Sequence, residues 1–201
     1  MWNEPAPVLD GHFVSLVPLS TDHVSGLELA ARDRSTYGFT AVPTSIDDHE
    51  AYVAQLLTLG RSGQALAFAQ VDSGSGDVVG TTRLMTPRLE NDRLYAIEIG
   101  GTWLAQSRQG SGINREAKLL LATYAFEHLG VVRVDCKTDA RNERARRSIE
   151  RWGATFEGVL RQWQPSLVAG EEGLFRDTAM YAVTAALWPT VRQKLERSLY
   201  S

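Results

Sequence analysis

The sequence predicts one mixed α/β domain, and three features of the chain support this fold class. Segments with strand-like alternation are interspersed with segments of helical apolar spacing from residue 12 to residue 199. The 201 residues, 43% hydrophobic and 22% charged, are enough to bury a sizeable single core. No internal repeat, low-complexity tract or linker divides the sequence. We therefore expect a single domain over residues 1–201.

The order of the elements follows from alternation, helical spacing and end signals. The predicted elements are strand 12–19, helices 20–33 and 45–60, strands 65–72, 78–86 and 93–104, helix 114–130, strand 131–139, helix 142–153, strands 155–168 and 177–184, and helix 188–199. Residues 20–22 are candidate caps of the first helix, and acidic residues open the second. Gly74 and Gly76 supply the positive φ angles that a hairpin turn between strands 65–72 and 78–86 needs.

The later elements rest on the same signals. Apolar residues recur at helical spacing after residue 114, and Gly130 ends that helix. Residues 131–139 form a short strand rich in β-branched residues, and the basic helix that follows ends at Gly153. Pro189 lies near the first turn of the last helix, where proline is tolerated.

A pair of glycines, Gly100 and Gly101, lies inside the predicted strand 93–104. Glycine weakens a strand, because it has no side chain to pack and loses much conformational freedom on folding. The pair therefore indicates a bulge, or a place where a ligand or another backbone comes close.

The loop before residue 114 is a candidate anion site. Residues 109–118, QGSGINREAK, bring two glycines to the start of an amphipathic helix, whose N-terminus favours negative charge. Arg115 and Lys118 add mobile positive charge beside it. The same residues also fit a plain loop that starts a helix. A Walker loop and the full dinucleotide fingerprint are both excluded by the spacing. The N–H groups that can turn toward one anion belong to Gly110, Ser111, Gly112, Ile113 and Asn114.

Composition and charge exclude several classes of protein. The net charge of −3, from 21 basic and 24 acidic residues, gives no general reason to bind nucleic acid or an anionic membrane. No apolar run approaches the roughly 20 residues of a transmembrane helix, and residues 1–10 lack the features of a signal peptide, so we expect a cytoplasmic protein. The histidines have no metal-ligand spacing, so no metal site is expected. The one cysteine, Cys136, is expected to be a small buried hydrophobe.

Three motifs between residues 98 and 161 resemble the GNAT superfamily of N-acetyltransferases. QGSGIN, residues 109–114, resembles the acyl-CoA pyrophosphate loop, usually Q/R-x-x-G-x-G/A, with Asn114 in place of the last small residue. EIGGTWL, residues 98–104, resembles the strand before that loop, and residues 141–161 resemble a block of the RimJ/RimL branch. The resemblance implies a mostly antiparallel sheet of about seven strands with helices on both faces, and a splayed strand pair that holds acyl-CoA.

The resemblance also implies roles for individual residues. In GNAT proteins the strand that corresponds to 93–104 splays from its neighbour at a bulge, and the pantetheine arm lies in the gap between the two strands. The main chain of Trp103, Leu104 and Ala105 is thereby expected to bond pantetheine. Gln109 belongs to the pyrophosphate loop. Asn142 matches a family asparagine whose amide bonds the arm, although asparagine also suits the N-cap of helix 142–153. The basic residues of helix 142–153 and the residue before it usually form a solvated helix face, although one or two of them could bind the 3′-phosphate of CoA. This cluster consists of Arg141, Arg144, Arg146, Arg147 and Arg151.

Amine acetylation needs a base, because most amines are protonated at pH 7. Glu98 is the candidate, since it lies among apolar neighbours where desolvation would raise its pKa toward the working range. The resemblance places it on the strand that lines the acceptor cleft. The alternative is a glutamate that faces solvent or pairs with an arginine.

The departing CoA thiolate needs an acid, and here the sequence leaves the family pattern. Many GNAT proteins have a tyrosine seven residues after the asparagine, where this chain has Ile149. The serine often present in the RimJ/RimL branch is Ala145 here. Ser148, three residues further on the same helix face, is the candidate acid, with water or a plain surface serine as the alternatives.

These observations predict an enzyme that transfers an acetyl group from acetyl-CoA directly to a primary amine, on a protein N-terminus or a small molecule. The alternative is an acyl-CoA-binding sensor or partner protein that no longer catalyses.

Of the five tryptophans, Trp103 and Trp163 are the two that could lie near the acceptor. An apolar stripe on the last helix predicts either packing on its own sheet or the interface of a homodimer, since several RimJ/RimL proteins pair. This stripe consists of Leu187, Val191, Leu195 and Leu199.

Overall fold

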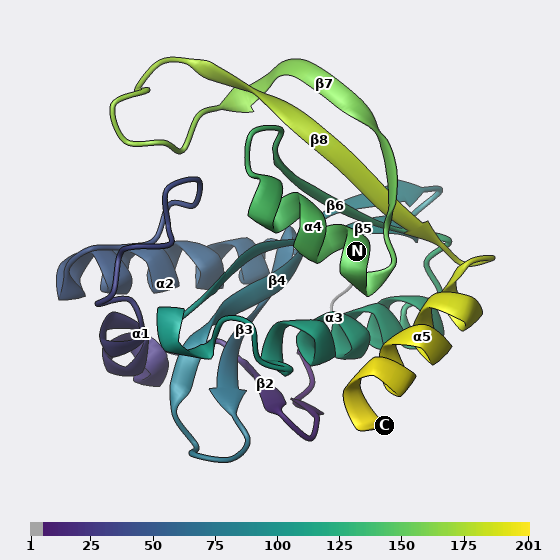
Figure 1. Ribbon diagram of the computed structural model, residues 1–201, viewed down its shortest axis with the longest axis horizontal. Helices are drawn as coiled ribbons and strands as arrows, with labels where there is room; N and C mark the ends of the chain where they lie inside the picture. Colours follow the sequence, from purple (N-terminus) through teal and green to yellow (C-terminus); the bar gives the residue numbers. More distant parts are fainter. Residues whose placement is uncertain (1–5) are drawn as a thin grey trace.

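A computed structural model describes residues 6–201 and is built around an eight-stranded sheet (Figure 1). The strand order is β1-β2-β3-β4-β5-β6-β8-β7, and every neighbouring pair is antiparallel except β5 and β6. The seven longer strands match the seven expected ones. The eighth, β1, is only two residues long, too short for alternation to reveal. The strands are β1 Leu9–Asp10, β2 Val14–Pro18, β3 Ala65–Asp72, β4 Val78–Glu90, β5 Arg93–Leu104, β6 Arg133–Asp139, β7 Thr155–Pro165 and β8 Phe175–Thr184.

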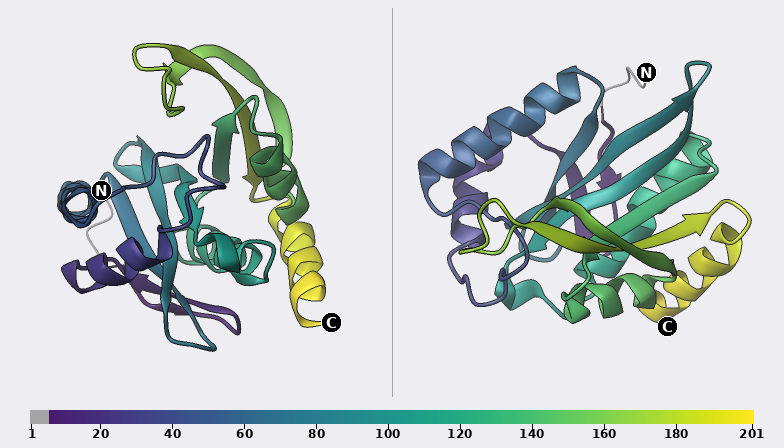
Figure 2. Two further views of the ribbon diagram at one scale, coloured as in Figure 1. Left: turned by 60° about the vertical axis from the view of Figure 1, so that its left-hand side comes forward. Right: turned by 90° about the horizontal axis from the view of Figure 1, so that it is seen from above.

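Helices cover both faces of the sheet, as the fold class predicts (Figure 2). Helices α1 and α2 pack against one face around Leu27, Val53 and Ala69, and α3, α4 and α5 lie on the other. The expected helix 114–130 is α3 followed by a π-helical turn, Tyr124–His128, which helical spacing does not distinguish. The helices are α1 Val24–Ala30, α2 Ile46–Arg61, α3 Ile113–Thr123, α4 Glu143–Trp152 and α5 Trp188–Tyr200.

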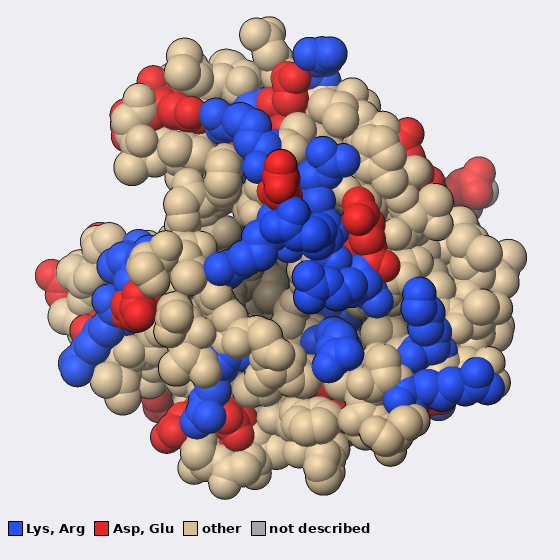
Figure 3. All heavy atoms as spheres, in the orientation of Figure 1, with Lys and Arg blue, Asp and Glu red and all other residues tan. Residues whose placement is uncertain are grey.

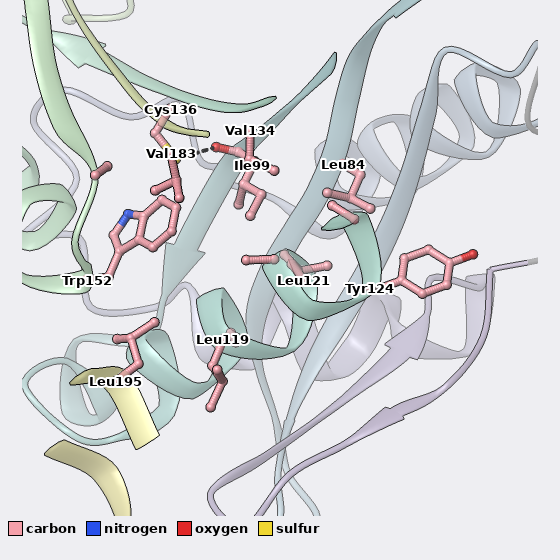
Figure 4. Close-up of a cluster of buried hydrophobic side chains, with 14 of the residues drawn as sticks. Leu84, Ile99, Leu119, Leu121, Tyr124, Val134, Cys136, Trp152, Val183 and Leu195 are labelled. Atoms are coloured by element: carbon pink, nitrogen blue, oxygen red, sulfur yellow. Dashed lines mark hydrogen bonds between the residues drawn. The ribbon is translucent and has the colours of Figure 1, made fainter. Parts of the chain in front are cut away.

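The core beneath α3, α4 and α5 contains most of the apolar stripe on the last helix (Figure 4). Val191, Leu195 and Leu199 are each at most 9% exposed, whereas Leu187 is 45% exposed. Packing within the chain therefore buries the stripe, and the stripe gives no reason to expect a homodimer. Cys136 is in the same core, where its Sγ donates to the Ile99 carbonyl at 3.3 Å.

A buried carboxylate in α3 fixes both ends of the described chain. Glu116, fully buried, accepts hydrogen bonds from the backbone N–H groups of His12, Phe13 and Val14 at 2.9, 2.6 and 2.8 Å. It also accepts one from the Tyr200 hydroxyl at 2.6 Å. These four donors satisfy a charge that would be costly to bury alone. The N-terminus of α3 is thereby held next to β2 and the end of α5.

The parallel strands β5 and β6 separate partway along their length. They pair only at Ala96 with Arg133, Ile97 with Val134 and Glu98 with Asp135. Both strands continue beyond this point, and residues 99–104 and 136–139 are called the splayed ends below. The β4–β5 register also shifts between Thr81 and Arg83, beside the glycine pair. The bulge and the splayed pair expected from the sequence are therefore both present.

Two further features bear on function. None of the helices in residues 6–201 is long and apolar enough to cross a membrane. The same residues contain no group of three or more His, Cys, Asp or Glu side chains arranged to hold a metal ion.

Candidate active site

The glycine pair makes room for side chains above the splayed part of β5. Gly101 has φ +55°, and a Cβ there would lie 2.4 Å from Arg83 Nε. At Gly100 a Cβ would lie 2.8 Å from Glu98 Oε1 and 2.9 Å from Met85 Sδ. A carboxylate, a thioether and a guanidinium therefore lie in a row over bare backbone. The close approach that the sequence predicted is made, on this face, by side chains of the chain itself.

Glu98, the candidate base, is buried but has a charged partner. It is 6% exposed, and its Oε2 accepts from Lys137 Nζ at 2.8 Å and from the Thr86 hydroxyl at 3.1 Å. The partner is a lysine from the neighbouring strand rather than the arginine considered above. The sequence expectation of a carboxyl desolvated among apolar neighbours therefore misses this ion pair, which compensates the charge of Glu98.

The loop before α3 presents unpaired backbone donors at the helix start. Gly110 has φ +81°, and α3 begins at Ile113. The Ile113 N–H is directed at the Ser111 hydroxyl at 3.3 Å, so it is already bonded, contrary to the sequence expectation. Within the described residues no hydrogen bond uses the N–H groups of Gly110, Ser111, Gly112 or Asn114. These donors, with the helix dipole, suit an anion.

Gln109 braces the loop through its side chain. Its Nε2 donates to Thr36 Oγ1 at 2.8 Å and to the Leu104 carbonyl at 3.0 Å. Its Oε1 accepts from Arg144 at 2.6 Å. The side chain therefore joins the α1–α2 connection, the end of β5 and α4. We infer that it shapes the loop, since all of its polar atoms are already bonded.

Much of the main chain expected to meet pantetheine is already bonded within the protein. The Ala105 N–H donates to the Val79 carbonyl at 2.7 Å, and the Trp103 carbonyl accepts from Gln70 Nε2 at 3.2 Å. The Leu104 carbonyl accepts from the Tyr37 hydroxyl at 2.9 Å as well as from Gln109. Successive N–H groups of a strand point to opposite sides, so the Leu104 N–H points away from β4, toward β6. The Leu104 N–H is thus free to bond a ligand. The Trp103 carbonyl and the Ala105 N–H are already bonded, so they do not fit the expected contacts with pantetheine.

Lys118 does not supply mobile charge to the loop, which corrects the sequence expectation. It is 6% exposed, and its Nζ donates to the Thr102 hydroxyl at 2.6 Å and to the Thr82 hydroxyl at 3.4 Å. Burial lowers the pKa of Lys118 from 10.5 to about 8. The spacing from the loop to Lys118 did not show that the side chain faces the sheet. Arg115 is half-buried and donates to the Ser198 carbonyl at 3.4 Å.

Two polar side chains of α3 and α4 meet beside the loop, and a third caps the start of α4. Asn142 caps α4, because its Oδ1 accepts from the Ala145 N–H at 3.0 Å, and its Nδ2 bonds no described residue. The Ser148 hydroxyl accepts from Asn114 Nδ2 at 3.1 Å, so this serine contacts the loop and is not simply solvated. Asn114 Oδ1 is buried and has no hydrogen-bond partner in the described part of the chain. The Asn142 amide and Asn114 Oδ1 are therefore available to a ligand.

Basic side chains gather over α4, on the face that Figure 3 shows. Arg144 reaches Gln109, Arg147 pairs with Glu143 at 3.0 Å, and Arg146 donates to the Tyr181 hydroxyl at 3.0 Å. Of the cluster of five, Arg151 alone has no bonded partner in residues 6–201. Arg147 is therefore held by an acid, and Arg144 and Arg151 are the members best placed for an added phosphate.

Arg141 joins the two segments that flank a notch in the surface. The notch opens on the left of Figure 3, between the α1–α2 connection and the β7–β8 loop. The guanidinium donates to Asp139 at 2.8 Å and to Glu171 of the β7–β8 loop at 2.7 Å. It also lies over the Phe39 ring, 5.5 Å from its centroid. Trp103 is buried under α2, and Trp163 is 55% exposed on β7, so of these two tryptophans Trp163 is the one open to a partner molecule.

Sequence reasoning missed polar residues on the last strand. Arg176 on β8 is 8% exposed, and its Nε is buried without a partner in residues 6–201. Thr178, two residues further, is fully buried, and its hydroxyl likewise bonds none of the described residues. Alternation along residues 176–180 places both on one face, which was a readable signal. What the sequence could not show is that this face adjoins Glu98.

The family assignment follows from similarity to known proteins. The family model described as acetyltransferase (GNAT) domain matches residues 14–155. A GCN5-related N-acetyltransferase from Brucella melitensis is 28% identical, over 98% of this chain and 86% of that one, with a TM-score of 0.83. A protein from T. thermophilus, provisionally described as an acetyltransferase, is 32% identical over the full length of both chains, with a TM-score of 0.82.

A more distant structure has the same fold. Mycobacterium smegmatis RimJ, solved in complex with CoA-disulfide, is 22% identical over 97% of this chain and 93% of that one, with a TM-score of 0.75. No curated protein sequence matches the chain. The matched family model and the full-length similarity show that this chain belongs to the GNAT family of N-acetyltransferases.

Proposed function

We propose that the chain transfers the acetyl group of acetyl-CoA to a primary amine at the splayed ends of β5 and β6. The observation that carries this proposal is the position of Glu98, a buried carboxylate at the last paired residue before the strands separate. Unpaired N–H groups of the 109–114 loop lie beyond the same end of β5. Acetyl-CoA carries a pyrophosphate, and these N–H groups suit it. RimJ, which has this fold, was solved with a CoA compound.

The described residues fit acyl-CoA as a substrate. The N–H groups at the start of α3 suit the pyrophosphate, and the Leu104 N–H and the Asn142 amide suit the amide groups of pantetheine. Direct transfer forms a bond between the amine nitrogen and the acetyl carbon and breaks the carbon–sulfur bond. Glu98 accepts the proton that the amine loses, directly or through one water. A proton from Ser148 or from water completes the CoA thiol.

The alternative, a CoA-binding protein without activity, has one observation in its favour. Ser148 is hydrogen-bonded to Asn114, and the family positions for an acid are Ala145 and Ile149. Water can protonate a thiolate, since the pKa of an alkyl thiol lies above neutral pH, about 8.5 for a free cysteine, and the protonated form is favoured there. We therefore favour the enzyme. The cytoplasmic location and the homodimer stay predictions.

Thiol release from acetyl-CoA tests the proposal. The protein is incubated with acetyl-CoA and a panel of small primary amines and N-terminal peptides, and free CoA is followed with a thiol reagent. Burial raises the pKa of Cys136 to about 12, so the native protein adds little background. Amine-dependent thiol release, with an acetylated product in the mass spectrum, is expected. Thermal stabilisation by CoA without release for any amine would favour the non-catalytic alternative.

A further inference from the structure

Arg176 is a buried arginine that bonds none of the described residues through its guanidinium. It is 8% exposed, and no hydrogen bond or ion pair joins its guanidinium to any described residue. Burial lowers the pKa of Arg176, against the opposing effect of the nearby charges of Asp139 and Glu98. A guanidinium is costly to bury unless its donors are bonded. Such a group in the middle of a polar site is suited to an anionic ligand.

The side chain lies on the same face of the sheet as Glu98. Met180 is opposite Lys137 in the ladder, and Thr178 is opposite Asp139. Residues directly opposite in an antiparallel pair share a face, and alternation puts Arg176 on that face too. Because Lys137 bonds the Glu98 carboxylate, the candidate base belongs to this face. The unpaired Thr178 hydroxyl lies between Arg176 and this centre along the strand.

The local charges leave two guanidinium groups without carboxylate partners. Glu98 is bonded to Lys137, and Asp139 is bonded to Arg141, which also holds Glu171. Among the described residues, Arg83, over the glycine pair, donates only to Met85 Sδ at 3.3 Å. Arg176 and Arg83 therefore flank the Glu98 centre, and neither forms an ion pair with a described carboxylate.

We propose, resting on the proposed acetyl transfer, that the acceptor carries an oxyanion near its primary amine, and that Arg176 binds this oxyanion. A carboxylate is the ligand that the site fits, because a planar guanidinium donates two parallel hydrogen bonds to it and the Thr178 hydroxyl can add a third. The amine of the same molecule then lies toward Glu98. Arg83 supplies a second positive charge across the site. The acceptors are thus amino acids or peptides with a carboxylate close to the reacting amine.

Matched acceptors test this recognition directly. Each carboxylate-bearing amine is compared with its carboxamide, which has the same shape without the charge, and with its phosphonate, which keeps an oxyanion of another geometry. For the wild type we expect kcat/KM to be about 10- to 100-fold higher for the carboxylate than for the carboxamide. In Arg176→Met that preference is lost, because only the carboxylate acceptor becomes worse. An equal or higher kcat/KM for the phosphonate would assign the site to phosphate-bearing acceptors instead.

Controls separate a ligand site from a structural arginine. Arg161→Met removes an exposed arginine of the same hairpin, which pairs with Asp177 at 3.3 Å, and should leave the preference intact. Arg83→Gln should reduce the preference by less than Arg176→Met. Thermal stability of Arg176→Met should equal or exceed that of the wild type, since it removes an unpaired buried charge. Should this variant be too unstable to assay, Arg176→Lys, which keeps the charge without the planar fork, should show a reduced preference.

The outcomes distinguish this inference from the proposed function. Equal kcat/KM for carboxylate and carboxamide in the wild type, or an equal loss for both in Arg176→Met, would overturn the inference and leave acetyl transfer standing. If no amine is acetylated, the proposed function fails. Binding of the carboxylate-bearing amines then tests whether Arg176 holds an oxyanion. Thermal stabilisation of the wild type, but not of Arg176→Met, by the carboxylate acceptors would uphold the oxyanion site. Stabilisation of both proteins, or of neither, would overturn it.

Discussion

Glu98 on β5 and Lys137 on β6 form an ion pair, with 2.8 Å between Oε2 and Nζ, where the two strands separate. The pair joins the strands just beyond their last ladder position, Glu98 with Asp135. It also fixes the carboxylate over Gly100, where a side chain would collide with it. Catalysis and local stability therefore depend on the same carboxylate, and a substitution must separate the two effects.

Glu98→Gln is expected to lower kcat by about 10²-fold while CoA binding is kept, because the amide cannot accept the proton of the amine. It should also lower the free energy of unfolding by about 2 kcal/mol, since Lys137 loses its partner. The double variant Glu98→Gln with Lys137→Met should recover stability without recovering kcat. Steady-state kinetics and urea unfolding of the three proteins measure this. Full turnover by Glu98→Gln at every pH would assign proton removal to a water relay.

The extent of sequence prediction differs between the fold and the site. Alternation and helical spacing are local, so seven strands and the main helices could be predicted, but the two-residue β1 could not. The bulge was readable because Gly100 and Gly101 are adjacent and each weakens a strand. The Glu98–Lys137 pair joins residues 39 positions apart, and only the β5–β6 register brings them together.

Buried polar side chains were the least predictable part. Lys118 follows a glycine-rich loop, and its spacing alone suits either the anion site or the sheet. Its contact with Thr102 depends on how α3 is rotated against the sheet. Glu116 lies between Arg115 and Ala117 in the sequence, and nothing in this neighbourhood indicates that it accepts from three N–H groups around residue 13. Arg176 could be placed on a face by alternation, but its lack of a partner is a property of the folded chain.

Ser148→Ala is expected to lower kcat by less than about 10-fold, since water can replace a weak acid. Asn114→Ala should have a larger effect on CoA affinity, because it removes the unpaired buried Oδ1 beside the loop as well as the bond to Ser148. Calorimetric titration with CoA and single-turnover acetylation separate binding from chemistry. A fall of about 10³-fold in kcat for Ser148→Ala would instead establish this hydroxyl as the acid.

Gly112→Val is expected to weaken both folding and CoA binding, since a Cβ at Gly112 would lie 2.9 Å from the Phe13 ring. The variant alone therefore does not isolate the loop. In a Phe13→Ala background the ring is absent, so the added side chain should cost less stability, while the loss of CoA affinity should persist if the loop holds pyrophosphate. Thermal melts with and without CoA measure both quantities. Unchanged CoA affinity in that background would remove the loop from the site.

Lys118→Met is expected to raise the free energy of unfolding at pH 7 by about 1 to 3 kcal/mol, because the buried ammonium pairs with no carboxylate of residues 6–201. Its two acceptors stay satisfied, since the Thr82 and Thr102 hydroxyls are 2.8 Å apart and bond each other. Burial lowers the folded-state pKa of Lys118 to about 8, while the unfolded value stays near 10.5. Between these values the unfolded chain binds more protons, so this lysine makes the stability of the wild type rise with pH.

The difference in the free energy of unfolding between Lys118→Met and the wild type isolates the titration of Lys118, because all other groups titrate in both proteins. We expect urea unfolding to show the advantage of Lys118→Met at pH 7 and to show the stability difference moving by about 3 kcal/mol in favour of the wild type as the pH rises from 8 to 10.5, so that the advantage is lost or reversed. CoA affinity should not change, since the side chain faces the sheet and not the loop. A less stable variant at pH 7 would mean that the hydrogen bonds to Thr102 and Thr82 outweigh the burial of the charge. Weaker CoA binding would return Lys118 to the cofactor site.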